Sequence, residues 1–350
     1  ESRIMIKTYQ ELTRLGRLRR LRKLAETALK HYQISDAILT FQHYGGNVIF
    51  RVDVLDPVAP YNDCEFFLPN RYNLRILSMN NPQFTVSELT WITVLRNELD
   101  LPVPEPVTNL DGQLLTTIST PGVPQGKVVS LMRWVDGRHY TETSLRPHHA
   151  KAWGQLTGRM HQFAAQWTPP DDFKRFHWDW EGQLGNGVLR TPVDEVVASM
   201  PTEVQEPFII ISKQLRDVLE SIGKGCGAYG MIHSDMYLEN VLFKAGKPRL
   251  IDFEDCGFGY WMLDIGIVLA QFRWSDQWSQ IRDAFLDGYL QMHSLPVAQL
   301  EHLELFMAMP YATNVLWASA MIIEDPAMRA ENEKWRDTDG KNLLRFFNER

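Results

Sequence analysis

The sequence has little cysteine. Its 350 residues contain three, Cys64, Cys226 and Cys256. Three cysteines cannot build a disulfide framework, and none of them lies in a CxxC pair or a Cys/His cluster with zinc-site spacing. We therefore expect the protein in a reducing compartment, the cytoplasm.

The chain also lacks an excess of basic charge. Lys and Arg total 36 against 43 Asp and Glu, a formal net charge of −7. This balance disfavours nucleic acid and anionic membranes as partners. No apolar run reaches the ~18 residues that a membrane-spanning helix needs, and the N-terminal segment has no signal-peptide hydrophobic stretch. We expect neither a nucleic-acid nor a membrane partner, and the sequence does not indicate the oligomeric state.

The composition is that of an ordinary globular protein, with 44% hydrophobic and 23% charged residues. At about 150 residues per domain, the length predicts two domains or one large bilobal unit. Strand patterns dominate the first part and helical patterns the second, with a change of character near 132–138. We therefore divide the chain into 1–132 and 133–350.

The first part begins with a basic amphipathic helix over residues 11–30, in which leucines recur every three or four positions. Such a helix can bind a membrane or a partner, but one leucine stripe is also what a helix docked on its own domain needs, and we favour docking. A hairpin follows, with strands at 37–41 and 48–52 and a turn at 44–47. The remaining expected elements are a strand at 72–77, a helix at 83–99, and strands near 113–118 and 127–133.

The second part is expected to be mostly helical, with long helices at 147–167 and 205–222. Its most informative stretch is 231–256, MIHSDMYLENVLFKAGKPRLIDFEDC. We predict two short strands there, at 241–243 and 249–251, on either side of the turn 244–247. The motif residues stand around this hairpin: His233-x-Asp235, then Asn240, then Asp252.

Transfer of a phosphoryl group from ATP explains this order. A carboxylate at Asp235 could accept the proton of an attacking hydroxyl. Mg²⁺ prefers hard oxygen ligands, which Asn240 and Asp252 offer. The order Asp, Asn five residues later, and Asp after a strand–turn–strand matches the kinase pattern HRDxxxxN…DFG. Alternatively, the three residues could have only structural roles, in turns and as helix caps. Asp252 argues against this alternative, because it stands between Ile251 and Phe253 in an apolar strand, where an unpaired carboxylate is costly.

These residues resemble the aminoglycoside phosphotransferase and choline kinase-like family, relatives of protein kinases. The family pattern is close to HGDxxxxNxL…xIDFxD, and this chain has HSDMYLENVLF, LIDFEDCGFG and YWMLDIG. Ser234 replaces the common Gly. The resemblance implies an α+β, bilobal protein-kinase-like fold with a small β-rich N-lobe and a larger helical C-lobe. It implies Asp235 as catalytic base, with His233 in the same catalytic motif.

The resemblance also implies Mg²⁺ ligands at Asn240 and Asp252. Asp264, in YWMLDIG, would brace the catalytic loop from behind or cap a helix. The segment LMRWVDGR resembles the passage where adenine would bond to the backbone, at Met132 and Trp134. The segments LRIL, VPEP and MRWVDGR resemble those of bacterial members of the family that are homoserine-kinase-like or stress-response-kinase-like.

Nucleotide-binding residues are expected in the first part. Gly45, Gly46 and Asn47 form the hairpin turn that the family places over the phosphates. Arg75 occupies the third-strand position where protein kinases carry Lys, and Glu88 is its candidate helix partner. Arg for Lys is not a conservative change, because the guanidinium is larger and bonds bidentately.

The resemblance therefore implies an enzyme that uses ATP and Mg²⁺ to phosphorylate a hydroxyl group of a small molecule: an amino alcohol, aminoglycoside, amino acid or sugar. Aromatic residues and the acidic Glu254 and Asp255 suit an amine-bearing or sugar acceptor. Two alternatives stay open. One is a protein Ser/Thr kinase of the same fold. The other is a catalytically weak nucleotide-binding protein, which Arg75 and the GGN turn would allow.

Overall fold

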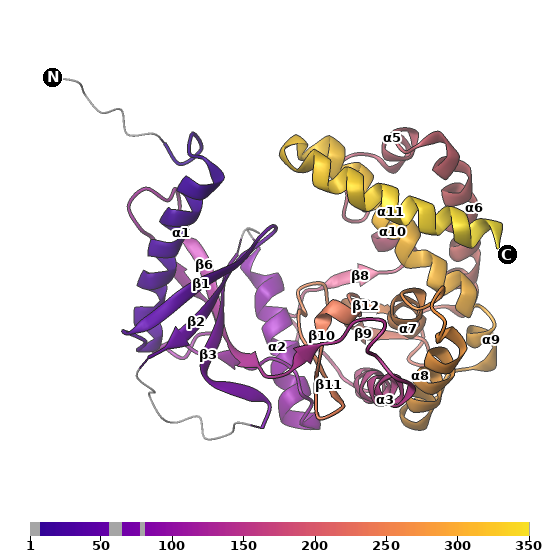
Figure 1. The fold of residues 1–350 in the computed structure, drawn as a ribbon, viewed down its shortest axis with the longest axis horizontal. Coiled ribbons are helices and arrows are strands. Elements are labelled where there is room, and N and C mark those ends of the chain that lie inside the picture. Colours follow the sequence, from indigo (N-terminus) through magenta and orange to yellow (C-terminus); the bar gives the residue numbers. More distant parts are fainter. Residues whose placement is uncertain (1–7, 56–64, 78–80, 350) are drawn as a thin grey trace. The chain divides into compact units, whose positions relative to one another are not determined.

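The computed structural model describes residues 8–55, 65–77 and 81–349. Cys64 and most of the Pro- and Asn-rich stretch near 55–70 lie outside these residues. The chain forms two compact units: Glu1–Gly137 with Arg249–Ile251, and Arg138–Pro248 with Asp252–Arg350 (Figure 1). The sequence did not predict that 249–251 belongs to the first unit, and the boundary at 132/133 stays a prediction.

In its described residues, the first unit is an antiparallel six-stranded sheet with two α-helices. The sheet order is β1-β2-β3-β6-β4, and β5 pairs with β6. The elements are α1 (Arg14–Leu29), η1 (Lys30–Tyr32), β1 (Ala37–Tyr44), β2 (Val48–Val54), β3 (Phe67–Ile76), α2 (Pro82–Leu99), β4 (Pro106–Val107), β5 (Thr116–Ile118) and β6 (Lys127–Val135). The expected hairpin, third strand and both helices are confirmed.

Helix α1 packs on this sheet, as the leucine stripe predicted. Leu21 and Leu24 are buried in one cluster with Phe50 of β2. The basic side chains also bind the unit, because the Arg22 guanidinium donates to the Leu39 carbonyl (2.6 Å) and that of Arg14 to the Tyr44 carbonyl (2.8 Å). The charged face of α1 is therefore partly used to hold the helix in place.

The second unit is mainly helical and contains two small three-stranded sheets, ordered β11-β10-β7 and β8-β12-β9. Its helices are α3 (Pro147–Ala164), α4 (Trp180–Leu184), α5 (Val193–Ala198), α6 (Thr202–Ile222), η2 (Leu238–Asn240), α7 (Trp261–Ala270), α8 (Trp278–Met292), α9 (Val297–Leu300), α10 (Leu303–Glu324), η3 (Pro326–Met328) and α11 (Arg329–Asn348). Its strands are β7 (Arg138–His139), β8 (Phe176–Trp178), β9 (Tyr229–Ile232), β10 (Val241–Lys244) and β12 (Gly257–Tyr260), and β11 (Lys247–Leu250) begins in this unit and ends in the first.

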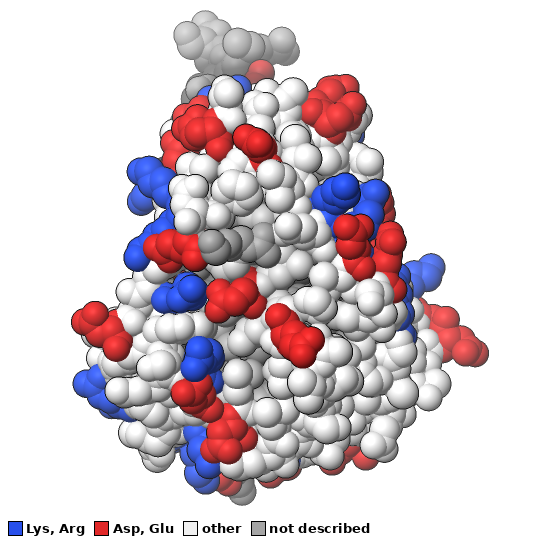
Figure 2. Space-filling view, turned by 90° about the vertical axis from the view of Figure 1, so that its right-hand side faces the viewer, with Lys and Arg blue, Asp and Glu red and all other residues white. Residues whose placement is uncertain are grey.

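Helix α10 corrects the expectation that the chain has no long apolar segment. It is long and apolar enough to cross a membrane by length and composition, but 72% of its most apolar window is buried. It packs beside α11 and α7, so its apolar surface is covered by the protein (Figure 1). On the face in Figure 2, acidic and basic side chains are interspersed over uncharged surface, and neither sign gathers in a broad patch.

Helices α3 and α8 approach each other closely enough to require glycine. A Cβ at Gly154 would overlap the Phe285 carbonyl oxygen, and one at Gly288 would overlap the Lys151 carbonyl oxygen. The backbone itself forms this contact, so no rotamer change could relieve the overlap. The contact fixes the two helices that carry His161 and Tyr289.

We expect Gly288→Ala to lower the free energy of unfolding by about 1–3 kcal/mol, the usual cost of overpacking. Urea unfolding followed by circular dichroism measures it. Gly227→Ala is the matched control, because a Cβ at Gly227 would meet nothing within 4 Å. Equal stability of both variants would show that the helices can move apart without cost.

Candidate active site

The catalytic loop begins where β9 ends, at His233. This side chain is fully buried, its ring lies 4.5 Å from that of Phe253, and its Nδ1 accepts a hydrogen bond from the Asp235 backbone N–H (3.3 Å). These contacts fix the turn in front of Asp235. The placement favours a positioning role for His233 over direct contact with reacting atoms.

Asp264 holds the same loop from behind. Its Oδ1 accepts from the Ser234 N–H (2.7 Å) and its Oδ2 from the His233 N–H (3.0 Å). Ser234 has a φ of +68°, a left-handed conformation that costs energy in a non-glycine residue. The two hydrogen bonds stabilise that turn, so the predicted brace is confirmed. The alternative of a helix cap is wrong, because the N-cap of α7 is Tyr260 and Asp264 lies inside the first turn.

Asp264 is itself held by a buried chain of side chains. His161 Nε2 lies 3.0 Å from Asp264 Oδ2, and His161 Nδ1 lies 2.8 Å from the Tyr289 hydroxyl oxygen. With a hydrogen on Nε2, the imidazole donates to Asp264, and its Nδ1 accepts from the Tyr289 hydroxyl, so both ring nitrogens are bonded. In the sequence, His161 is marked only by the pattern Gly158-x-x-His161 within the long helix expected at 147–167, and no pattern marks Tyr289.

Asn240 and Asp235 interact directly. The Asn240 Nδ2 donates to Asp235 Oδ2 (2.6 Å) and to the Asp235 backbone carbonyl (3.0 Å). Since the nitrogen end of the amide faces Asp235, its oxygen end is left without a hydrogen-bond donor among the described residues. An amide oxygen in this state is a suitable ligand for a hard cation such as Mg²⁺.

Asp252 differs from its expected placement. It follows β11 rather than lying inside a strand, it has a φ of +62°, and it is exposed. The argument that it is a buried carboxylate in an apolar strand is therefore wrong. Its exposure leaves the carboxylate open to a ligand. Within the described part of the chain, no three His, Cys, Asp or Glu side chains form a cluster that could hold a metal, so the Asn240 amide would be needed.

The pKa of Asp235 is raised well above its ordinary value. Burial is the largest cause, and the negative charges of Asp255 and Asp252 add to it. A carboxyl with a raised pKa accepts a proton more readily near neutral pH, as a general base requires. The sequence analysis considered Asp255 only as an acid suited to an amine-bearing or sugar acceptor, and it missed the effect of Asp255 on the pKa of Asp235.

The predicted nucleotide-binding residues all lie in the first unit. Arg75 Nη2 pairs with Glu88 Oε2 at 2.8 Å, and both side chains are almost fully buried, so the predicted pairing is confirmed. The turn at 45–47 closes with a hydrogen bond from the Gly45 N–H to the Asn47 carbonyl (3.1 Å), and Asn47 is buried. A Cβ at Gly46 would meet nothing within 4 Å, so the turn is open there.

Met132 and Trp134 lie in β6, Met132 buried and Trp134 half-buried. The sequence missed Arg133 between them. Its guanidinium pairs with Glu105 at 2.9 Å and lies 4.2 Å from the centre of the Phe67 ring. This buried cation ties β6 to its neighbours, and the roles of Met132 and Trp134 toward adenine stay predictions.

We expect Glu88→Gln to destabilise the protein by about 3–5 kcal/mol. The substitution removes the negative charge of a buried ion pair and leaves the positive charge of Arg75 buried without a counter-ion. Urea unfolding measures this. The double variant Arg75→Met with Glu88→Gln should recover part of the loss, since no buried charge remains. A single variant as stable as the parent would show that the pair contributes nothing.

Asp235→Asn is expected to stabilise the fold at neutral pH. A carboxyl whose pKa is raised by folding opposes folding once it is charged, so its cost grows as pH rises through the raised pKa. The variant should therefore unfold at a higher temperature than the parent at pH 8 and at the same temperature near pH 4. Each kcal/mol corresponds to about 2–4 °C in a unit of 150–250 residues. A gain that is constant with pH would contradict this cause.

Comparison with known proteins identifies the family. The model of the phosphotransferase enzyme family matches residues 71–300. Amicoumacin kinase of Bacillus subtilis (strain 168) is 25% identical over 198 residues, 55% of this chain and 53% of that protein. Homoserine kinase of Polaromonas naphthalenivorans (strain CJ2) is 26% identical over 172 residues, 48% of each protein. The chain thus spans about half the length of these two relatives.

Solved structures agree over nearly the whole chain. A microcompartment-associated aminopropanol kinase has a TM-score of 0.73 and 24% identity, covering 92% of this chain and 95% of that one. An amicoumacin kinase in complex with AMP-PNP and Ca²⁺ has a TM-score of 0.71 and 20% identity, covering 94% and 95%. At these identities the likeness shows the fold, so the predicted kinase-like architecture is confirmed. The chain belongs to the phosphotransferase enzyme family.

Proposed function

We propose that this protein transfers the γ-phosphoryl group of ATP to a hydroxyl group of a small molecule, with Asp235 as the general base. The observation that carries the proposal is the state of Asp235. Its carboxyl has a raised pKa, is bonded to the nitrogen end of Asn240, and lies near the acidic Asp252 and Asp255. A carboxyl with only a structural role would not need two further acids beside it.

The reaction balances without any other reactant. The acceptor oxygen forms a bond to the γ-phosphorus while the bond from that phosphorus to the bridging oxygen of the β-phosphate breaks, and ADP leaves. The proton of the acceptor hydroxyl passes to the Asp235 carboxylate. The Asn240 hydrogen bond and the backbone bonds to Asp264 keep that carboxylate in one position, which supports in-line attack.

The donor set fits a divalent cation. Mg²⁺ would be held by the amide oxygen of Asn240 and the exposed carboxylate of Asp252. When bound, it would neutralise charge on the phosphates. Among the relatives, the AMP-PNP and Ca²⁺ named for an amicoumacin kinase structure support a nucleotide and a divalent ion here as well.

The names of the relatives support a small acceptor that carries an amine. Amicoumacin kinase, aminopropanol kinase and homoserine kinase are named for small molecules.

Arg75 in place of Lys remains compatible with this activity, because a guanidinium can bond a carboxylate and phosphate oxygens together. Its ion pair with Glu88 is the arrangement that activity in this family would need.

The test is phosphoryl transfer from radiolabelled Mg·ATP to a panel of alcohols, amino alcohols and sugars. We expect Asp235→Asn to lower the rate by about 10²–10⁴-fold, the usual contribution of a general base. The exposed Glu220 on α6 offers a matched control, and Glu220→Gln should keep the parent rate. Transfer at the parent rate by Asp235→Asn would remove Asp235 from the reaction. Label on protein rather than on small molecules would favour a protein kinase.

A further inference from the structure

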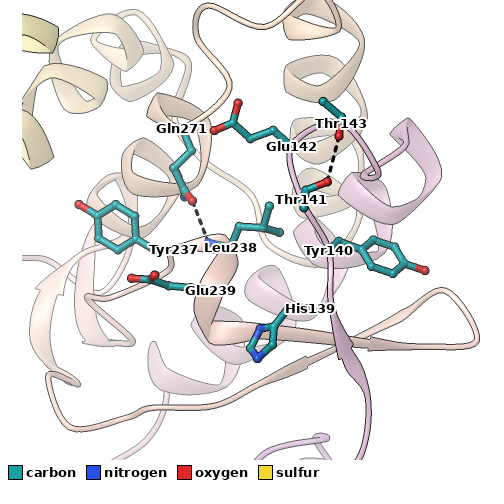
Figure 3. A pocket seen from close by; sticks show the side chains of 9 residues that line it. All are labelled: His139, Tyr140, Thr141, Glu142, Thr143, Tyr237, Leu238, Glu239 and Gln271. Atoms are coloured by element: carbon teal, nitrogen blue, oxygen red, sulfur yellow. Dashed lines mark hydrogen bonds between the residues drawn. The ribbon is translucent and has the colours of Figure 1, made fainter. Parts of the chain in front are cut away.

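Helix α1 and the residue after it concentrate positive charge. Residues 14–30 contain seven Lys and Arg and one acid, Glu26, in a chain whose formal net charge is −7. The proposed reaction belongs to the catalytic loop, where Tyr237, Leu238 and Glu239 line a pocket of about 640 Å³ (Figure 3). That reaction uses no cation of α1, so it does not explain the charge of this helix.

Docking on the sheet explains one side of α1. The buried residues of this side are Leu21, Leu24, Ala25, Ala28 and Leu29. The exposed residues of 14–30 are Arg14, Leu15, Arg19, Lys23, Glu26 and Lys30. With 3.6 residues per turn, Arg19, Lys23 and Lys30 fall within about 40° of one another around the helix axis, on the side opposite to the buried leucines. We call these three residues the basic ridge.

The arginines on the flanks of the basic ridge keep their charge. The Arg20 guanidinium donates to the Gly122 carbonyl (2.7 Å) and that of Arg22 to the Leu39 carbonyl (2.6 Å). A carbonyl orients a guanidinium but has no net negative charge, so it does not neutralise the cation. Within residues 8–55, 65–77 and 81–349, no cation of α1 forms an ion pair with an acid. The exposed side of the helix is therefore positively charged along its length.

These charges are unfavourable for the helix itself. Its first turn contains Arg14 and Arg17 and no acid, although the helix dipole favours acids at that end. Arg19 and Lys23 stand four residues apart, where like charges repel. In the described part of the chain, the side chains of Arg19 and Lys23 form no hydrogen bond or ion pair. Docking therefore does not explain these two cations, and an anion facing the helix would relieve both costs.

Four acids stand close to this helix in the sequence or through a backbone contact. Glu11 precedes it, Glu26 lies on it, Asp36 follows η1, and Asp111 stands next to Leu110, which bonds to η1. The seven cations outnumber them. Exposed charges further apart than about 8 Å are largely screened at physiological ionic strength, so the net charge of the whole chain does not set the field at α1. The expectation from net charge, that no anionic membrane binds, does not hold for this helix.

Two exposed leucines flank the basic ridge. Leu15, one turn before Arg19, is 58% exposed. At the other end of the helix Leu110 is 59% exposed, and its N–H donates to the His31 carbonyl of η1 (2.9 Å). Apolar side chains beside cations suit the interface of a membrane, where leucine enters the acyl boundary and Lys or Arg meets the phosphates.

Nucleic acid fits the same helix less well. Its phosphates would attract the cations but would leave both leucines in water. The six exposed residues of 14–30 include no Asn or Gln that could read adenine and no aromatic ring on which a base could stack. The combination of cations and exposed leucines therefore favours a lipid surface.

We infer that the exposed side of α1 binds a membrane surface that contains anionic phospholipid. Arg19, Lys23 and Lys30 contact the headgroup phosphates, and Leu15 enters the interface. The apolar side of the helix stays on the sheet, so the protein lies on the membrane without spanning it, and the association is reversible. The inference goes beyond the proposed reaction, because none of these residues belongs to the catalytic loop.

The test is flotation of the full chain with vesicles of phosphatidylcholine alone or with about 30% phosphatidylserine. We expect binding only to the vesicles that contain phosphatidylserine, and its loss at about 0.5 M salt, where charges are strongly screened. Arg19→Gln combined with Lys23→Gln should lower the partition coefficient about 30-fold, the usual effect of two cations at an anionic surface. Leu15→Ser should lower it about 5-fold, because less apolar surface enters the interface.

Lys334→Gln combined with Lys341→Gln is the matched control, because these exposed lysines of α11 change the net charge by the same amount. It should bind as the parent does, and the melting temperature of each variant checks that the fold is kept. Equal loss in the control would show that binding follows net charge and would overturn the inference. Binding to phosphatidylcholine alone, or to neither kind of vesicle, would also overturn it. So would tighter binding of a short DNA duplex at the same salt, or self-association without lipid that disappears in the α1 variant.

Discussion

The site depends on one buried carboxylate. Asp264 is fully enclosed, and a charge in that position is costly unless hydrogen bonds compensate it. Here the compensation comes from the His233 and Ser234 N–H groups and from the His161 imidazole. The same bonds hold Ser234 in a left-handed conformation, and the chain can then present Asp235. The same hydrogen bonds therefore stabilise the buried carboxylate of Asp264 and fix the conformation of the loop.

The catalytic loop places carboxylates of like charge near one another. Asp235 lies near Asp252 and Asp255, and burial already disfavours its ionised form. The hydrogen bonds from Asn240 to Asp235 and from the His233 and Ser234 N–H groups to Asp264 hold the loop in place despite this repulsion. Burial and repulsion at Asp235 therefore lower the stability of the fold once this carboxyl is charged.

Local patterns in the sequence predicted what depends on local spacing. The leucine stripe gave the docked face of α1, and the HxD…N spacing gave the loop that Asn240 and Asp235 close. The sequence did not predict the contact of His161 with Tyr289, which are 128 residues apart. A single chain carries no signal for such pairs, because the periodicity of each helix says which face is buried and not which helix covers it. Asp252 was misplaced for a related reason: its apolar neighbours suggested a strand, while its backbone turns away at positive φ.

The loop from Asp235 to Asn240 alternates in burial. Met236, Leu238 and Asn240 are buried, whereas Asp235, Tyr237 and Glu239 are partly or fully exposed. Tyr237 has an extended backbone, whereas Glu239 lies in the 3₁₀ turn η2, so the alternation is one of burial and not that of a single strand. The bonds from Gln271 and Asp264 hold both ends of that segment. Any shift of Met236 or Leu238 would move Asp235 with them, so the position of Asp235 depends on hydrogen bonds at both ends of the segment.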